Sequence, residues 1–464
     1  MKEKTDIKSI SHSLIKFSLP LILSGIMQQL YSWIDAVIVG NYEGDIALGA
    51  VGSTATISNF FISVITGFTL GLSILFAHKF GSGEISVISQ ILSSFTILAG
   101  LIFAVFSVVG FIFTPALLKL MDTTPEVIYL AEDYLRIIFA GIPFLAVFNI
   151  YSAALRGIGD SRTPFLAVLI SSVCNILLDL IFIILLGFGV KGAASATVIS
   201  QAFMTIFIVI YGRKKHSLLS MNRKAFSRTS ISKGISYGTP PMIQSSLTAL
   251  GNLILQNFMN GFGTETVIAI TTAYRIDSII LLPIINFGSG ISTIVAQSYG
   301  AGENKKAKKT LSVGIILMTA IALTLTVLIV FFGKHLIALF GADGSAVDIG
   351  QRFFVRIASF YIVYGLATAA RGYIEGKGYM LYSGIAGLAA LVVRIFASYA
   401  MADTLGNMVI AYAEAFSWGV LLILYFAKIL HRKQTQNLLL QLLQYYVGYD
   451  IIILYIPKNF KEMR

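Results

Sequence analysis

The sequence AHKFGSGE (residues 77–84) returns as AQSYGAGE (residues 296–303), so one motif recurs at an offset of 219 in the numbering (296 − 77). A second pair, AALRGIGD (153–160) and TAARGYIE (368–375), recurs at an offset of 215 (368 − 153). The two pairs occur in the same order and at nearly the same offset. This pattern indicates two similar halves with the same order of elements.

The composition of the chain is that of a membrane protein. Of its 464 residues, 56% are hydrophobic and 12% are charged, about half the charged fraction of a soluble globular domain. These values argue against a large water-soluble enzyme. A membrane helix takes roughly 20 to 25 residues, so the chain has room for about a dozen spans with short connections.

Apolar stretches bounded by glycine, proline or charge predict an all-α integral membrane protein with twelve transmembrane helices. The predicted helices cover residues 14–39, 54–77, 87–113, 127–154, 164–187, 190–212, 235–261, 267–298, 310–333, 347–370, 379–401 and 407–429. Several are longer than the hydrocarbon core requires, so we expect them to tilt or to protrude from the bilayer.

The basic residues that connect these helices fall almost entirely on one side of the predicted membrane. Alternate connections hold sixteen of them, and the other connections hold only Lys119, Lys191 and Lys334. The sixteen are Lys79, Arg156, Arg162, Arg213, Lys214, Lys215, Arg223, Lys224, Arg228, Lys233, Lys305, Lys306, Lys308, Lys309, Arg371 and Lys377. Cytoplasmic connections are rich in Lys and Arg, so both termini are expected in the cytoplasm. The net charge of +12 is then a topology signal, and no nucleic-acid partner is expected.

Together, the repeat and the helix count predict two pseudo-symmetric six-helix lobes. We place the N-lobe at residues 1–212, a basic cytoplasmic linker at 213–234 and the C-lobe at 235–430. Both halves keep the same orientation, so the repeat axis lies along the membrane normal, and substrates of such transporters bind between the halves.

The remaining tail, residues 431–464, is harder to assign. Its apolar part, 438–456, includes Gln441, Gln444 and Asp450. We expect an interfacial or poorly ordered helix, with a thirteenth span as the alternative.

Ionisable residues inside membrane spans are costly and are functional candidates by default. Asp35 lies near the outer end of the first predicted helix, with Gln28 and Tyr31 on the same helical face. Asp179 has Asn175 one turn before it, and an amide can hydrogen-bond a carboxyl group in either protonation state. The two carboxylates suit a site that alternately binds and releases a proton. The alternative is that these groups only hold helices together.

Further polar residues could complete this N-lobe site. Thr197 of the sixth predicted helix offers a hydroxyl, and either Ser152 or Asn149 of the fourth could contribute a further polar group.

Two carboxylates in the C-lobe are weaker candidates. Arg275 lies two residues from Asp277, and Arg394 or Arg356 could neutralise it from another helix, so we expect Asp277 to form a structural ion pair. Glu414 could be either structural or functional.

Motifs of common enzymes do not occur in the sequence. It contains no GxxxxGK[ST] phosphate loop and no HExxH metal motif, and its five histidines are scattered. We therefore expect a protein that is not an enzyme and that has no cofactor.

Several motifs in sequence order resemble the multidrug and toxic compound extrusion (MATE) family. They are YSWIDAVIVGNYEGDIALGAVG (31–52), FGSGE and YGAGE at matched places, ALRGIGDSRTP (154–164) and YRIDSIILLPIINFGSGISTIVAQ (274–297). The resemblance covers about residues 14–430. It implies a V-shaped secondary transporter that expels cationic or amphipathic compounds in exchange for protons or sodium ions.

The DinF-like branch of that family implies a specific N-lobe network, which couples ion movement to drug release through bending of helix 1. Its pattern matches Gln28, Asp35, Asn175, Asp179 and Thr197, whereas its helix 4 asparagine falls on Ser152, one turn from Asn149. The NorM-like branch relies on a helix 7 glutamate. That region reads PPMIQSSLTALGN (240–252) here and has no carboxylate, so a C-lobe site of that kind is not expected.

These observations lead to one functional expectation with two alternatives. We expect a multidrug exporter of the cell membrane that works as a monomer among membrane lipids. Its coupling ion would be a proton or a sodium ion at Asp35, Asp179 and Asn175, and binding would bend helix 1 and shrink a Met- and Phe-lined pocket. The alternatives are a flippase for lipid-linked oligosaccharides, whose cavity should be more basic, and a membrane scaffold without transport.

Overall fold

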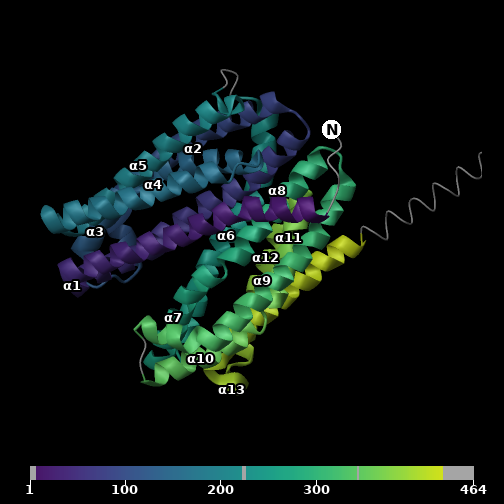
Figure 1. The fold of residues 1–464 in the computed structure, drawn as a ribbon. Coiled ribbons are helices and arrows are strands. Elements are labelled where there is room, and N and C mark those ends of the chain that lie inside the picture. The colour runs from purple at the N-terminus through teal and green to yellow at the C-terminus, as the bar shows by residue number, and fades with distance from the viewer. Residues whose placement is uncertain (1–6, 222–225, 342–343, 432–464) are drawn as a thin grey trace, which may run out of the picture.

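The computed structural model describes residues 7–221, 226–341 and 344–431, and over these ranges the chain is helical with no β-strand. Two groups of helices lie side by side (Figure 1). The first, from α1 to α5, is the N-lobe, and the second, from α6 to the last described helix, is the C-lobe. The predicted tail helix at 438–456 lies outside the described residues.

The element α1 (Ile7–Gly81) consists of two membrane helices. A straight helix of its 75 residues would be about 110 Å long, far longer than a bilayer is thick. The helix is broken at Gly44, whose backbone has φ 83° and ψ −177°. Both ends of α1 approach α8 (Leu282–Gly300), because Gly290 lies against Ser18 and Gly81 against Gln297. The chain therefore reverses at Gly44.

The other helices of the N-lobe follow the predicted order. They are α2 (Ile85–Leu120), α3 (Ile128–Gly157), α4 (Arg162–Asp179) with the π-helical turn η1 (Leu180–Leu185), and α5 (Gly189–Lys215). Together with the two halves of α1, they give six spans. A short 3₁₀ turn, η2 (Ser217–Leu219), precedes the C-lobe.

The C-lobe also has six spans, two of which are broken. Its elements are α6 (Arg228–Asn260), α7 (Thr264–Ile280) continued by α8, α9 (Asn304–Leu339), α10 (Gly344–Ala358) bent by 46° from α11 (Tyr361–Gly376), α12 (Met380–Ala400), and a last helix that runs to His431 after α13 (Ala402–Leu405) and η3 (Gly406–Met408). The break between α7 and α8 lies at Leu281, just before Pro283. Within the described ranges, twelve spans in two lobes are therefore confirmed.

Most helices extend beyond their predicted bounds. For example, α9 covers Asn304–Leu339 where the hydropathy pattern predicts 310–333. Its first residues include lysines that water can solvate, so the helix can continue outside the apolar layer. Helices α3 and α11 likewise extend past the apolar stretch. Arg156 therefore lies in the last turn of α3 and Arg371 inside α11, although the hydropathy pattern assigns both to connections.

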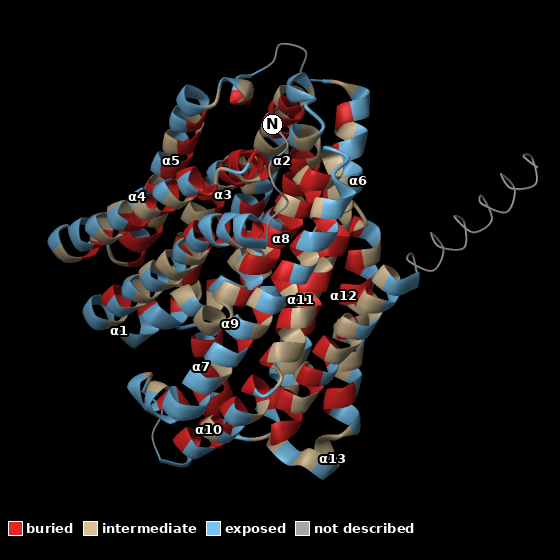
Figure 2. Ribbon diagram, turned by 45° about the vertical axis from the view of Figure 1, so that its right-hand side comes forward, coloured by how far each residue is buried: buried red, intermediate tan, exposed pale blue. Residues whose placement is uncertain are grey.

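Apolar side chains cover the outside of the bundle. Exposed residues alternate with buried ones along most helices (Figure 2), and on α2 the exposed set includes Leu101, Phe111 and Ile112. Such a surface is unfavourable in water and favourable against lipid tails. The helices therefore expose apolar side chains where lipid tails would contact them, while the interior holds apolar side chains together with the buried polar groups.

The lobes meet in a tight, pseudo-symmetric contact at the end of the bundle that carries the turns 82–84, 158–161, 301–303 and 377–379. We call this end the basic end. His78 Nε2 of the N-lobe lies 2.7 Å from the Gly376 carbonyl oxygen of the C-lobe. Gln297 Nε2 of the C-lobe donates to the Gly157 carbonyl oxygen of the N-lobe at 2.8 Å. The two contacts correspond through the offset of 219 of the first motif pair (297 − 78 and 376 − 157). The structure thus aligns the second pair at 219 instead of 215, and Gly159 and Gly378, which are 219 apart, both have a positive φ.

Candidate functional site

A cavity of about 130 Å³ lies inside the N-lobe. Its lining includes five of the residues predicted from the sequence: Gln28 and Tyr31 of α1, Asn149 of α3, Asn175 of α4 and Thr197 of α5. The polar residues of four spans therefore converge on one point, as the sequence pattern predicts. Phe148 and Met204 supply apolar lining.

The two carboxylates lie one helical turn beyond this lining. Asp35 follows Tyr31 on α1, and Asp179 follows Asn175 at the end of α4, just before η1. Their charges are close enough to interact, and the Tyr134 hydroxyl of α3 lies within electrostatic reach of both. The structure therefore brings Asp35 and Asp179 into one polar group with the cavity.

These carboxylates have no cationic partner among the described residues. Asp179 is fully buried, yet neither of its carboxylate oxygens has a hydrogen-bond partner in the described part of the chain, and Oδ1 of Asp35 also has none there. Both polar atoms of the Asn175 amide are likewise unpaired. A buried carboxylate without a partner is energetically costly, and this cost is removed when the group binds a proton or a metal cation.

The candidates on α3 occupy different positions. Asn149 lines the cavity, and its Nδ2 donates to the Leu145 carbonyl oxygen at 2.9 Å. Ser152 is buried but does not line the cavity. Of these two, the structure brings Asn149 to the site.

Other polar residues at this cavity were not among the predicted ones. They are Thr66, Ser171, Ser172, Ser200 and Gln201. A signal for two of them exists in the sequence, since Ser171 lies four residues before Asn175 and Gln201 four residues after Thr197. Each therefore shares a helical face with a predicted residue.

The repeat gives this site a counterpart in the C-lobe with different chemistry. Adding 219 places Arg394 at the position of Asn175 and Ser398 at that of Asp179 (175 + 219 and 179 + 219). Both line a cavity of about 340 Å³. Arg394 Nη2 donates to Glu414 Oε2 at 2.9 Å and to the Tyr274 hydroxyl at 3.0 Å, and this hydroxyl donates to Glu414 Oε2 at 3.0 Å. The Glu414 carboxylate at this C-lobe cavity is therefore neutralised by Arg394.

The structure corrects the expectation for Asp277. No described Lys, Arg or His forms a salt bridge with this buried carboxylate; it accepts a hydrogen bond from the Tyr361 hydroxyl instead. Arg394 pairs with Glu414, and Arg356 Nη1 donates to the Arg352 carbonyl oxygen at 2.9 Å. The predicted ion pair was wrong because sequence proximity did not indicate which helix faces which.

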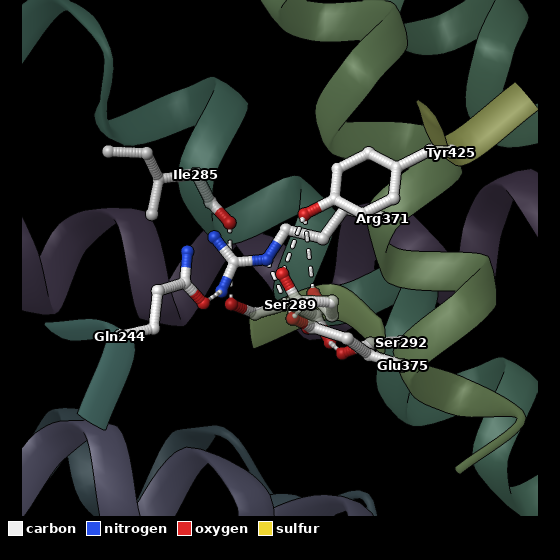
Figure 3. Close-up of polar contacts among 8 residues, drawn as sticks. Gln244, Ile285, Ser289, Ser292, Arg371, Glu375 and Tyr425 are labelled. Carbon is white, nitrogen blue, oxygen red and sulfur yellow. Dashed lines mark hydrogen bonds and ion pairs between the residues drawn. The ribbon is translucent and has the colours of Figure 1, made fainter. Parts of the chain in front are cut away.

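A second polar cluster of the C-lobe is held by Arg371 and Glu375 (Figure 3). Arg371 Nε donates to Glu375 Oε1 at 2.6 Å, and Ser383 Oγ donates to the same oxygen at 2.7 Å. The cluster joins α11 to α12 and also contacts Gln244 of α6, whose Oε1 lies 3.5 Å from Arg371 Nη2. Since each charge has a partner, this cluster is a structural element of the C-lobe.

The donor groups of the described residues bear on metal binding. Within the described ranges, no group of three or more His, Cys, Asp or Glu side chains is placed to hold a metal ion. Asp35, Asp179 and Asn175 together offer only oxygen donors from three side chains, the donor type preferred by hard cations.

Comparison with known proteins agrees with this architecture. The MatE family model matches residues 20–181 and 240–400, one match in each lobe and about one repeat apart. The chain is 29% identical over 456 residues to the probable multidrug resistance protein YoeA of Bacillus subtilis (94% of this chain, 98% of YoeA). It is 30% identical over 374 residues to YpnP of the same organism, also described as a probable multidrug resistance protein (80% of this chain, 84% of YpnP).

Solved structures show the same fold. An outward-facing multidrug resistance MATE family transporter of the MOP superfamily superposes with a TM-score of 0.86 at 23% identity, covering 92% of this chain and 97% of the other. The family model spans most of both lobes, and the match to YpnP covers four fifths of the chain. The chain therefore belongs to the MATE family of transporters.

Proposed function

We propose that this protein is a secondary active exporter that exchanges cationic or amphipathic compounds for protons or sodium ions at the N-lobe site. One observation carries the proposal: Asp35 and Asp179 lie in a membrane-embedded lobe without a cationic partner among the described residues. The equivalent C-lobe site contains its own cation, Arg394. Of these two equivalent sites, the N-lobe one therefore needs a cation from outside. Asp277 of the C-lobe also lacks a cationic partner among the described residues, but it accepts a hydrogen bond from Tyr361.

The arrangement of α1 provides a way to convert ion binding into movement. Asp35 lies on the first half of α1, nine residues before the break at Gly44 (44 − 35), and Pro20 removes one backbone hydrogen bond from the same helix. Neutralising Asp35 and Asp179 would remove the repulsion between α1 and α4. Helix α1 would then bend toward the cavity that Phe148 and Met204 line, and a bound compound would be displaced.

The substrate class is proposed from the relatives and from the site. YoeA is described as a multidrug resistance protein, and MepA of Staphylococcus aureus, 23% identical over 373 residues, as a multidrug export protein. An anionic site with aromatic and methionine lining suits organic cations, because it offers both charge and apolar contact area.

The orientation in the membrane is proposed from charge. The basic end holds the connections rich in Lys and Arg, which favours the cytoplasmic side. Both termini would then face the cytoplasm of a cell whose plasma membrane holds the protein as a monomer. Drug release would occur at the opposite end.

Transport by purified protein in liposomes tests the proposal directly. Efflux of a fluorescent organic cation is measured with a proton gradient or a sodium gradient imposed separately. We expect one gradient to drive transport by the wild type, and Asp35→Asn and Asp179→Asn each to reduce it to the background. Asp45→Asn is the matched control, since Asp45 is an exposed carboxylate just beyond the break. Full transport by Asp35→Asn would remove this residue from the mechanism.

A further inference from the structure

An open cavity of about 410 Å³ lies at the basic end, where the lobes meet. The N-lobe contributes Lys16 and Phe17 of α1, the turn between α3 and α4, and the end of α5, while the C-lobe contributes Ile294 and Gln297 of α8. Gln297 also donates the hydrogen bond to Gly157 that joins the lobes. Any molecule in this cavity would therefore contact both lobes beside their closing contact.

The charge of the cavity is positive. Its lining includes Lys16, Arg162, Lys215 and His216 but only one acid, Asp160. Asp160 already has three partners within the protein. Its Oδ2 accepts hydrogen bonds from Lys215 Nζ at 2.9 Å and from the Thr163 hydroxyl at 2.7 Å, and it lies 2.8 Å from His216 Nε2.

Two cations of the cavity remain available. Although burial of Asp160 acts in the opposite direction, its hydrogen bonds from His216, Thr163 and Lys215 hold the pKa of its carboxyl at about 2, so it is ionised in the cell. Lys16 and Arg162 are exposed, and neither side chain forms a hydrogen bond or ion pair with the described part of the chain. The cavity thus offers two cations without an anionic partner in the described chain, Lys16 and Arg162, while Asp160 is neutralised by its own partners.

The lining also includes three apolar side chains. Phe17, Ile158 and Ile294 lie in the same cavity as the charged residues, and Ile15 and Leu19 are exposed on the adjoining part of α1. A site that combines uncompensated cations with apolar side chains matches an amphipathic anion better than a small soluble one.

We propose that this cavity binds the phosphate headgroup of an anionic phospholipid from the cytoplasmic leaflet. Lys16 and Arg162 contact the phosphate, and the apolar residues contact the glycerol and the first part of the acyl chains. Because the lipid touches both lobes, it stabilises the closed basic end. The inference rests on the orientation proposed above, but not on the transport mechanism.

The thermal stability of the purified protein tests the lipid site without a transport assay. The melting temperature is measured in phosphatidylcholine nanodiscs and in nanodiscs that also contain phosphatidylglycerol. We expect phosphatidylglycerol to raise the Tm of the wild type, and the double variant Lys16→Gln/Arg162→Gln to lose this increase.

The matched control is Lys305→Gln/Lys308→Gln. It removes the same charge from exposed lysines of the basic end that do not line the cavity, and it should retain the full increase. Equal increases in both double variants would overturn the proposal, because the effect would then be general surface electrostatics.

A third condition distinguishes lipid from free phosphate. Inorganic phosphate is added to the protein in phosphatidylcholine nanodiscs at matched ionic strength, and we expect no increase in Tm. An increase that Lys16→Gln/Arg162→Gln abolishes would overturn the assignment to lipid. If the wild type shows the increase in Tm with phosphatidylglycerol but no transport under either gradient, only the proposed exporter is contradicted.

Discussion

The residues at equivalent positions of the two lobes show how one scaffold holds different chemistry. Asn175 and Asp179 correspond to Arg394 and Ser398, so the repeat carries an unpaired acid on one side and a paired base on the other. The pairing of Arg394 with Glu414 is expected to contribute to folding rather than to ion movement. This can be tested because removing one member of a partly buried pair is more costly than replacing both members.

We therefore predict that Arg394→Met lowers stability by about 1 to 3 kcal/mol, since it leaves the partly buried Glu414 without its cation. The double variant Arg394→Met/Glu414→Gln should recover most of this loss. The measurement is the Tm of each variant in detergent. If the double variant melts as low as the single one, the ion pair is not the source of the effect.

A second prediction at this scale concerns Asp160 and pH. Hydrogen bonds hold its folded pKa at about 2, below the value of about 3.9 for an unfolded chain. Its contribution to stability is thus complete above pH ~4 and is lost as the pH falls toward 2. Asp160→Asn should lower the Tm at neutral pH by a few °C, on the order expected for one buried interaction.

The same variant should also lose less stability than the wild type between pH ~5 and ~3. Parallel Tm profiles over this range would contradict the role of Asp160. Asp403→Asn, at an exposed site of the opposite end, controls for a general effect of losing one carboxylate.

The sequence predicts those parts of the candidate site in which the residues share one face of a single helix. Asp35 with Tyr31, and Asp179 with Asn175, share helical faces at a spacing of four residues, which the sequence displays directly. The partners of Asp277 and Arg394 come from other helices, so their choice depends on how helices rotate against one another. Nothing in the local sequence pattern predicts the hydrogen bond from the Tyr361 hydroxyl to Asp277.

At the scale of elements, hydropathy predicted the spans but not how they are broken. The reversal of α1 at Gly44 needs only one non-helical residue, where the sequence suggested a longer connection from 40 to 53. The π-helical turn η1 directly after Asp179 was also not predictable. Such turns often occur at functional sites, and this one lies in the span that carries Asp179.

The break at Gly44 can be tested on its own. A Cβ at this position would meet no atom within 4 Å, so Gly44→Ala changes only the backbone preference. With φ at 83° and ψ at −177°, a conformation that is essentially open only to glycine, we expect a loss of about 1 to 3 kcal/mol, seen as a lower Tm.

Gly52→Ala is the matched control for this prediction. Its Cβ would also meet nothing within 4 Å, but its φ is not in the left-handed region. The control should be neutral or slightly stabilising, because alanine favours helix. If both variants have the same Tm, the left-handed conformation of Gly44 is not what defines the reversal.

At the scale of the whole molecule, the repeat predicted the two lobes, but not the contact that closes the basic end. That contact crosses between lobes, and its members are related by the same offset as the motif: His78 with Gly376, and Gln297 with Gly157. Backbone atoms also pack directly here, since a Cβ on Gly81 would lie 2.0 Å from the Gln297 carbonyl oxygen. Alternating access would require these contacts to separate.

The two side-chain bonds should therefore set how often the basic end opens. We predict that His78→Ala/Gln297→Ala shifts the population toward an open basic end, because each lost bond contributes about 0.5 to 1.5 kcal/mol. Spin labels at Ser82→Cys and Asn304→Cys, in a Cys174→Ser background, report the distance between the lobes. The double variant should show a longer or broader distance distribution, whereas Ser312→Ala, on an exposed face of α9, should match the background. A Cβ on Gly300 would lie 2.2 Å from the His78 carbonyl oxygen, so backbone also packs closely at the second copy of the motif. An unchanged distribution would mean that the lobes stay together without the two side-chain bonds, through packing such as that at Gly81 and Gly300.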